Sequence, residues 1–287
     1  MSTLIDLRRR IKSVRNSQQI TQAMKTVSTA KFKKAQRIVL ESRPYWHTYP
    51  DLVSRVAGWL RDWDHPLLAK RQEKKIECVV ITSDKGLCGA YNSNLLARAA
   101  AFLEEKSVAA EARIIVIGKK ALHFFKRQDY PIDRIYAERI EKLSPETLRG
   151  IAQFLIELYV FNQTDAVYII YNEFKSILAP RITITRLLPV VIPAAEQAAE
   201  FLSPDWEPEL QSILESFLPL YIENQIIHSF YESQVAEQAA RMMAMENATK
   251  NAEDLISDLV KLLNKIRQAG ITKELLEIMT AVEELGR

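Results

Sequence analysis

The chain has 287 residues, a hydrophobic content of 48% and only two cysteines. This length and apolar content support a buried core in one large domain or two modest ones, and two cysteines are too few for a disulfide framework or a zinc site. Apolar runs never approach the roughly 20 residues of a membrane span, and helix periodicity begins at Leu4 without a preceding signal segment. We therefore expect a protein of a cytosol-like compartment with reduced cysteines.

The net charge is only +3, but the two ends of the chain are oppositely charged. Residues 1–43 contain eleven Lys or Arg and two Asp or Glu, a net charge of +9. Residues 206–287 contain seven Lys or Arg and fourteen Asp or Glu, a net charge of −7. Opposite charges favour pairing of the two ends with each other. The alternative for the basic end is an arm that binds nucleic acid or anionic lipid, and the acidic end argues against it.

The N-terminal segment is predicted to be a long helix, because it has neither Gly nor Pro from Thr3 to Arg43. Pro44 and Pro50 are expected to end or kink it, and a second helix is predicted over residues 52–68. Apolar residues at spacings of three and four predict a coiled-coil seam. The predicted seam residues are Leu4, Leu7, Ile11 and Val14, followed in a shifted register by Ile20, Met24 and Val27.

The middle of the chain alternates short apolar runs with helical patterns, which predicts a doubly wound α/β sheet. A last alternating run at 181–191 contains Pro189 and is predicted to be an edge strand, since proline cannot donate to a sheet ladder. The predicted buried parallel strands are residues 76–83, 113–118 and 166–174, and the predicted helices are residues 94–105, 119–127 and 145–162.

The C-terminal segment is predicted to be a second long helix that begins near Pro208 and is kinked or restarted by Pro219. Together the elements predict an antiparallel coiled coil of N- and C-terminal helices with an inserted doubly wound α/β (Rossmann-like) domain. We place the first arm at residues 1–70, the inserted domain at 71–205 and the second arm at 206–287. The predicted seam of the second arm is Leu255, Leu259, Leu262, Ile266 and Ala269, resumed by Ile278, Val282 and Leu285.

Catalysis is poorly supported by the sequence, and no cofactor or metal is predicted. The loop 83–92 contains Gly86 and Gly89, but its lysine, Lys85, precedes both glycines and cannot act as a phosphate-loop lysine. A tight turn that requires glycine is the simpler interpretation. The four histidines lack metal-ligand spacing, and no nucleophile elbow is present.

Polar residues crowd the long helices at places where an ordinary coiled coil would be apolar. One interpretation is solvated surface; the other is a shaft that touches several surroundings through weak, exchangeable contacts. Two groups of such residues, one on each long helix, are expected to face each other in an antiparallel pairing. The groups are Gln18, Gln19, Thr21, Gln22 and Lys25, and Lys265, Arg267, Gln268, Thr272 and Lys273, with Gln234, Gln238 and Arg241 further back.

Four segments resemble the gamma subunit family of the rotary F-type ATP synthase, in the family's order and over essentially the whole chain. They are LRRRIKSVRNSQQITQAMKTVSTAKFKKAQ at 7–36, SDKGLCGAYNSNL at 83–95, ESQVAEQAARMMAMENATKNA at 232–252 and NKIRQAGITKELLEIMTAVEEL at 264–285.

The resemblance implies a noncatalytic rotor shaft, present in single copy, that couples ion-driven rotation of the c-ring to conformational cycling of catalytic sites in a hexameric head. The implied partners are the alpha and beta subunits of the head, the epsilon subunit and the c-ring, without nucleic acid. The implied location is peripheral, on the cytoplasmic face of a bacterial plasma membrane or on a thylakoid-type membrane.

The resemblance also implies roles for single residues. Met24, Lys25, Arg241, Gln268 and Thr272 fall at positions where the family's shaft contacts the head. Glu207 falls in the family's contact region for the c-ring and epsilon.

Two alternatives remain from the residues alone: a structural coiled-coil scaffold with an α/β head, and a nucleotide-dependent hydrolase that uses the Gly86 and Gly89 loop.

Overall fold

The computed structural model describes residues 2–58, 65–137, 140, 143–177, 180–191 and 210–285. The chain divides into two compact units, Met1–Ser28 with Met242–Arg287, and Thr29–Arg241. Two long helices, α1 (Ser2–Gly58) and α5 (Leu210–Leu285), each contribute to both units. The domains predicted from the sequence are consecutive segments of the chain, whereas these units are defined by contacts. The predicted limits therefore stay a prediction.

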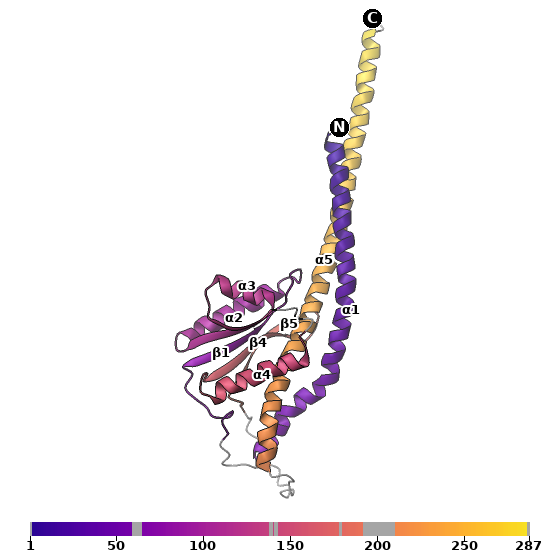
Figure 1. The fold of residues 1–287 in the computed structure, drawn as a ribbon. Helices are drawn as coiled ribbons and strands as arrows, with labels where there is room; N and C mark the ends of the chain where they lie inside the picture. Colours follow the sequence, from indigo (N-terminus) through magenta and orange to yellow (C-terminus); the bar gives the residue numbers. More distant parts are fainter. Residues whose placement is uncertain are drawn as a thin grey trace. The chain divides into compact units, whose positions relative to one another are not determined.

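The first unit is an antiparallel pair of helices (Figure 1). Thr21 Oγ1 of α1 lies 2.8 Å from Thr249 Oγ1 of α5, and Lys25 Nζ lies 3.2 Å from Glu246 Oε1. The residue number rises along α1 while that of its partner falls along α5, so the two helices run in opposite directions. The predicted antiparallel pairing is confirmed.

The buried seam keeps one heptad register along both helices. On α1 the prediction was right from Leu4 to Val14 but wrong for Ile20 and Val27, which are 60% and 56% exposed. The register instead continues through polar residues. The buried or half-buried seam residues are Leu4, Leu7, Ile11, Val14, Gln18, Thr21 and Lys25 of α1, and Met245, Thr249, Ala252, Ile256, Leu259, Leu263 and Ile266 of α5.

On α5 the predicted seam is right for Leu259 and Ile266. It is wrong for Leu255, Leu262, Ala269, Ile278 and Val282, which are exposed. The predicted pairing of residues 18–25 with 265–273 is also wrong, because residues 21 and 25 face 249 and 246. From residue 267 to residue 282 every side chain is exposed, since α5 extends past the start of α1 (Figure 1).

Leu259→Asp is expected to destabilise the helix pair by about 3 kcal/mol, because it places a carboxylate in the buried seam. Leu262→Asp is the matched control: its side chain is 44% exposed, so we expect a change below about 1 kcal/mol. Thermal melting followed by circular dichroism measures both. Equal destabilisation by the two variants would contradict the observed register.

The second unit contains a five-stranded sheet in the order β3-β2-β1-β4-β5. The first four strands are parallel. Strand β5 lies at the edge, as predicted, and pairs antiparallel with β4, which was not predicted. Strand β3 was not predicted. The elements are β1 (Lys75–Ile81), α2 (Tyr91–Ser107), β2 (Glu111–Ile117), α3 (Lys119–Arg127), β3 (Ile132–Tyr136), α4 (Pro145–Val160), β4 (Ala166–Phe174) and β5 (Pro180–Leu188).

Helices cover both faces of the sheet, which confirms the doubly wound class (Figure 1). Alternate residues of β1 point to opposite faces. Val79 and Ile81 join the core under α4 and the first part of α5, while Cys78 and Val80 join the core under α2 and α3. The α/β domain therefore buries a segment of the long helix α5 as part of its own core.

The long helices continue through their prolines, so the prediction that Pro44 or Pro50 ends the first helix is wrong, and the predicted kinks stay a prediction. Helix α1 continues through Pro44 and Pro50 to Gly58, and Pro219 lies inside α5. Near Pro44 and near Pro219, buried side chains hold the helix where a backbone donor is missing. Trp46 is 8% exposed in the cluster that joins α1 to α5 and the sheet, and Leu218 is fully buried next to Pro219.

Glu77 is a buried carboxyl group on the central strand β1. It is 2% exposed, and its Oε1 has no hydrogen-bond partner among the described residues. Burial, reinforced by Asp133 and opposed by Arg113, raises the pKa of Glu77 from 4.5 to about 8. Folding therefore favours the protonated form of this group.

The stability contributed by protonated Glu77 is expected to be fully present below a pH of 4.5 and to be lost as pH rises through about 8. The side chain in Glu77→Gln stays neutral at every pH. The difference in free energy of unfolding between variant and parent is therefore expected to shift by roughly 3–5 kcal/mol in favour of the variant as pH rises through this range. Urea unfolding at an acidic, a neutral and an alkaline pH measures the difference. Parallel pH profiles for the two proteins would count against an unpaired carboxyl group.

Candidate functional site

The carboxyl ends of β1 and β4 form the position where a doubly wound sheet usually binds its ligand. Strands β2 and β3 lie on one side of β1, and β4 lies on its other side. The direction in which the chain adds strands to the sheet therefore reverses between β1 and β4. In this chain the crevice is filled by the chain itself. Residues of α1 and α5, such as Phe32 and Val235, pack there against Cys88, Tyr91 and Phe174 in one buried cluster.

Polar contacts join α5 to both strand ends. Tyr91 Oη, at the start of α2, lies 2.7 Å from Ser233 Oγ. Glu232 Oε2 accepts the backbone N–H of Phe174, the last residue of β4, at 2.9 Å, and its Oε1 lies 3.5 Å from Arg43 Nη2 of α1. Burial raises the pKa of Glu232, which is only 2% exposed, although the Phe174 N–H and Arg43 oppose the shift.

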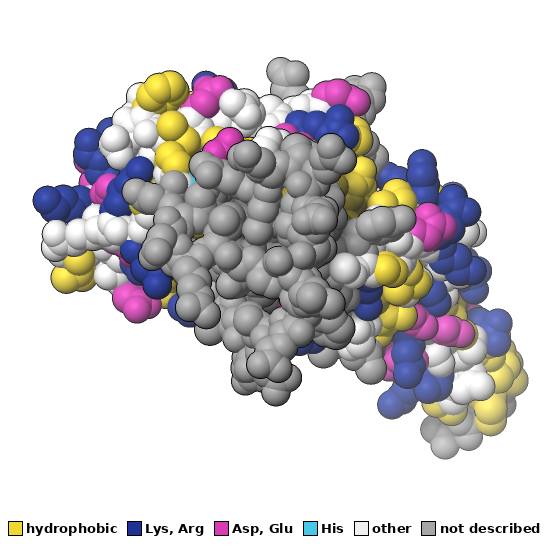
Figure 2. Space-filling view, turned by 90° about the horizontal axis from the view of Figure 1, so that it is seen from below, with side chains coloured by type: hydrophobic (Ala, Val, Ile, Leu, Met, Phe, Trp, Pro, Cys, Tyr) yellow, Lys and Arg dark blue, Asp and Glu magenta, His cyan; other side chains and the backbone are white. Residues whose placement is uncertain are grey.

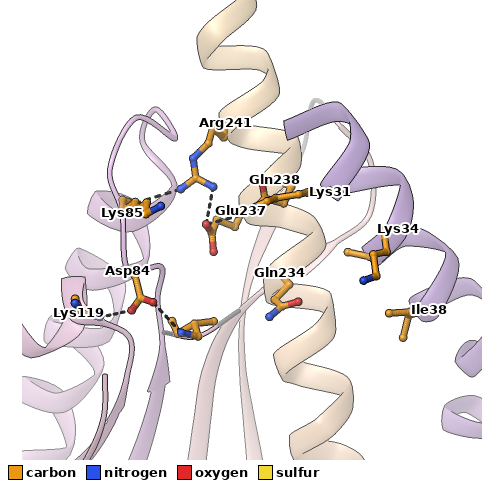
Figure 3. Close-up of a pocket in the computed structure, with 12 residues that line it drawn as sticks. Lys31, Lys34, Ile38, Asp84, Lys85, Lys119, Gln234, Glu237, Gln238 and Arg241 are labelled. Atoms are coloured by element: carbon orange, nitrogen blue, oxygen red, sulfur yellow. Dashed lines mark hydrogen bonds and ion pairs between the residues drawn. The ribbon is translucent and has the colours of Figure 1, made fainter. Parts of the chain in front are cut away.

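Arg241 joins α5 to the loop that follows β1. Its Nη1 lies 2.6 Å from Glu237 Oε1, and its Nη2 donates to the carbonyls of Lys85 and Gly86 at 3.3 and 3.4 Å (Figure 3). The guanidinium group is thereby used inside the chain, and the residue is 8% exposed. The loop turns through Leu87, whose φ of 63° is left-handed and uncommon for a residue with a side chain.

At the turn after β2, a protein carboxylate accepts backbone N–H groups at the start of a helix, as a bound anion would. Asp84 accepts the backbone N–H of Lys119, the first residue of α3, at 3.2 Å and that of Ile140 at 2.8 Å. Thr82 Oγ1 accepts the N–H of Ala121 at 2.9 Å. These donors are therefore not available to a phosphate. In the glycine loop itself, the backbone carbonyls of Lys85 and Gly86 are turned toward Arg241, which argues against a phosphate cradle there.

A groove of about 610 Å³ remains beside these contacts. It lies among α1, α5 and the loops at the carboxyl edge of the sheet, and Figure 3 shows side chains from all three around it.

The two cysteines are not poised for nucleophilic chemistry. Both are buried, and burial raises the pKa of the Cys78 thiol and of the Cys88 thiol. A raised pKa disfavours the thiolate, which is the reactive form. In the part of the chain that the structure describes, no group of three or more His, Cys, Asp or Glu is arranged to hold a metal ion.

The residues predicted as head contacts fall into two groups. Met24 and Lys25 are half-buried in the helix pair, whereas Gln268 and Thr272 are exposed on the last part of α5, where Thr272 Oγ1 donates to the Gln268 carbonyl at 3.0 Å. Arg241 is buried in the second unit, where it contacts Glu237 and the loop after β1, and its predicted contact with the head stays a prediction. Glu207 lies outside the described residues.

Sequence reasoning did not single out Glu232, Tyr91 and Ser233 as functional residues. One signal was available: three polar residues, Glu232 to Gln234, stand between Phe230 and Tyr231 on one side and Val235 and Ala236 on the other. Polar residues at core positions of a helix usually have a buried partner.

One face of the described surface carries side chains of mixed type. Seen from below, described Lys and Arg side chains alternate with Asp, Glu and small hydrophobic groups, so this visible face is not uniformly basic (Figure 2). Among the described helices, none has a stretch long and apolar enough to cross a bilayer.

Comparisons with known proteins agree with the resemblance. A family model described as ATP synthase matches residues 3–285. The ATP synthase gamma chain of Pelotomaculum thermopropionicum is 44% identical over 196 residues, which cover 68% of each chain. A chain of the Euglena gracilis mitochondrial ATP synthase (OSCP/F1/c-ring, rotational state 3) has a TM-score of 0.68 at 23% identity, covering 99% of this chain and 95% of that one.

A chain from the central stalk and c-ring of the Tetrahymena thermophila mitochondrial ATP synthase has a TM-score of 0.59 at 24% identity, covering 80% of this chain and 99% of that one. At these identities the two solved structures show a shared fold, whereas the family model and the Pelotomaculum relative identify the family. The chain belongs to the ATP synthase gamma chain family.

Proposed function

We propose that this chain is the central rotor shaft of a proton-translocating ATP synthase and has no catalytic site of its own. The observation that supports the proposal most strongly is the filled crevice at β1 and β4. The place where a doubly wound sheet would bind a substrate holds α1 and α5 through buried contacts. The proposed role of the α/β domain is then to hold the two long helices, and not to catalyse a reaction.

The proposed partners are the alpha and beta subunits of the head, the epsilon subunit and the c-ring. The Tetrahymena relative comes from a structure of a central stalk with a c-ring, which supports a peripheral place on the membrane through the same kind of ring. On α5, exposed apolar residues from Ile271 to Val282, including Leu275, Ile278 and Met279, favour a protein partner around this end of the helix.

The physical basis of coupling is unequal contact. A shaft whose sides carry different residues contacts each surrounding subunit differently, and a contact that differs between two conformations shifts the balance between them. Different polar residues are found along the shaft: the ion pair of Lys25 with Glu246 in the helix pair, and Gln268 and Thr272 on the part of α5 beyond the start of α1. Rotation then moves each catalytic subunit through successive conformations.

Purification from the native membrane tests the proposal. We expect one copy of the chain for each nucleotide-hydrolysing hexamer, and no magnesium-dependent ATP turnover by the isolated chain. Copies in multiples of two without such a hexamer would favour the structural scaffold. Saturable ATP turnover by the isolated chain would favour the hydrolase.

Gln268→Leu is expected to slow coupled ATP turnover in the reconstituted complex about threefold or more, because it removes a polar contact with the head. The melting temperature of the isolated chain is expected to stay unchanged, since Gln268 is exposed. Lys261→Leu is the control, because its salt bridge to Asp258 is on the exposed surface of the same helix. Unchanged turnover in the Gln268 variant would remove that residue from the proposed contacts.

A further inference from the structure

The groove beside Arg241 has an excess of positive charge. Lys34 from α1, Lys85 from the loop after β1 and Lys119 from α3 line it (Figure 3). Among the described residues, none of these three ammonium groups has an ion-pair partner. Lysines from three separate elements around one groove favour a ligand with more than one negative charge.

The two acids of the groove offset the charge of these lysines only in part, because Asp84 contributes a single negative charge and the charge of Glu237 is paired with Arg241. Asp84 accepts hydrogen bonds from two backbone N–H groups, and Glu237 is paired with Arg241 at 2.6 Å. Both carboxylates are therefore committed to contacts that hold the fold.

Gln238 supplies a second and independent sign of a ligand. The residue lines the groove and is only 6% exposed. Its Nε2 donates to Glu237 Oε1 at 3.4 Å, but its Oε1 has no hydrogen-bond partner among the described residues. A buried carbonyl oxygen requires an N–H or O–H donor, which a simple inorganic anion in its fully ionised form does not provide.

The remaining wall of the groove is apolar. Ala35 and Ile38 of α1 and Ile140 line it, and the volume of about 610 Å³ is within the range of small-molecule sites. The occupant is thus required to combine several negative charges, a hydrogen-bond donor and an organic surface.

We propose that this groove binds a nucleoside polyphosphate without reacting with it. The phosphates lie on Lys34, Lys85 and Lys119, and the organic part lies against Ile38 and Ile140, with a hydroxyl or amino group donating to Gln238 Oε1. The site uses the side chain of Lys85 but not the backbone of the glycine loop, whose carbonyls at Lys85 and Gly86 stay bound to Arg241. It goes beyond the proposed rotor function, which requires no ligand on this chain.

Calorimetric titration of the isolated full chain with ADP and with pyrophosphate, in about 50 mM salt, tests the proposal. We expect one saturable site for ADP, with pyrophosphate binding about tenfold more weakly. The double variant Lys34→Gln, Lys119→Gln is expected to lose about tenfold or more in ADP affinity. Lys33→Gln with Lys126→Gln is the matched control, since both lysines are exposed and neither lines the groove.

Gln238→Leu is expected to lower ADP affinity and leave pyrophosphate affinity unchanged, with a melting curve to verify folding. Absence of saturable binding up to about 5 mM ADP would overturn the proposal. So would equal affinity for ADP and pyrophosphate, or ADP affinity in the Lys34 and Lys119 double variant equal to that of the parent. The rotor assignment does not depend on any of these outcomes, because the titration uses no partner subunit.

Discussion

Gly118→Ala is expected to destabilise the α/β domain by at least about 3 kcal/mol. Gly118 follows β2 and precedes α3 with a φ of 103° and a ψ of 147°, a backbone conformation that is essentially restricted to glycine. A Cβ there would collide with the carbonyl oxygen of Thr82 and lie 2.7 Å from Ile140 Cδ1.

The neighbours of Gly118 have little freedom to move away. Thr82 is 1% exposed, and its Oγ1 already accepts the N–H of Ala121 at 2.9 Å while donating to the Ile117 carbonyl at 3.3 Å. Relief of the collision would therefore break contacts that hold the start of α3 on the sheet.

Gly150→Ala is the control for Gly118→Ala, and its expected effect has the opposite sign. Gly150 lies inside α4 on the exposed side, with nothing within 4 Å of an added Cβ. Alanine there is expected to stabilise the helix by about 0.5–1 kcal/mol. Urea unfolding followed by intrinsic fluorescence compares the two variants. A Gly118 variant as stable as the parent would contradict the described turn.

The sheet was largely predictable because its buried strands are continuous apolar runs. Strand β3 was missed because Asp133 and Arg134 occupy its middle, as an exposed edge position allows. The coiled-coil register was predicted only in part. Counting apolar residues moved the seam to Ile20 and Leu262, whereas the actual seam continues through Thr21, which finds a hydrogen-bonding partner in Thr249.

The candidate site was less predictable than the fold, because its contacts join residues far apart in the sequence. The Glu232 carboxylate meets a backbone N–H at Phe174 and a guanidinium at Arg43, and only the folded topology brings them together. Arg241 was singled out by resemblance as a contact with the head. Its bonds to the loop carbonyls at Lys85 and Gly86 could not be derived from its place on an acidic helix.

Glu232→Ala is expected to uncouple ATP hydrolysis from proton pumping in the complex, if the chain is the rotor that we propose. The substitution leaves the N–H of Phe174 buried without a partner and removes the pair with Arg43, a cost of about 3 kcal/mol at the joint between α5 and β4. We propose that torque reaches the c-ring through the α/β domain. When the contact between α5 and β4 is weakened, the helices can rotate without rotating this domain.

Inverted membrane vesicles measure both activities, hydrolysis by phosphate release and pumping by quenching of a pH-sensitive dye. In the Glu232→Ala complex we expect hydrolysis to remain within about twofold of the parent while the protons pumped per ATP fall about threefold or more. Glu232→Gln is the matched control, because its amide oxygen can still accept the Phe174 N–H, so it is expected to retain most of the pumping. Pumping that falls only in proportion to hydrolysis in the alanine variant would mean that this buried carboxylate stabilises the domain without transmitting torque. The comparison of alanine with glutamine therefore separates the mechanical role of the hydrogen bond at β4 from the charge that Arg43 recognises.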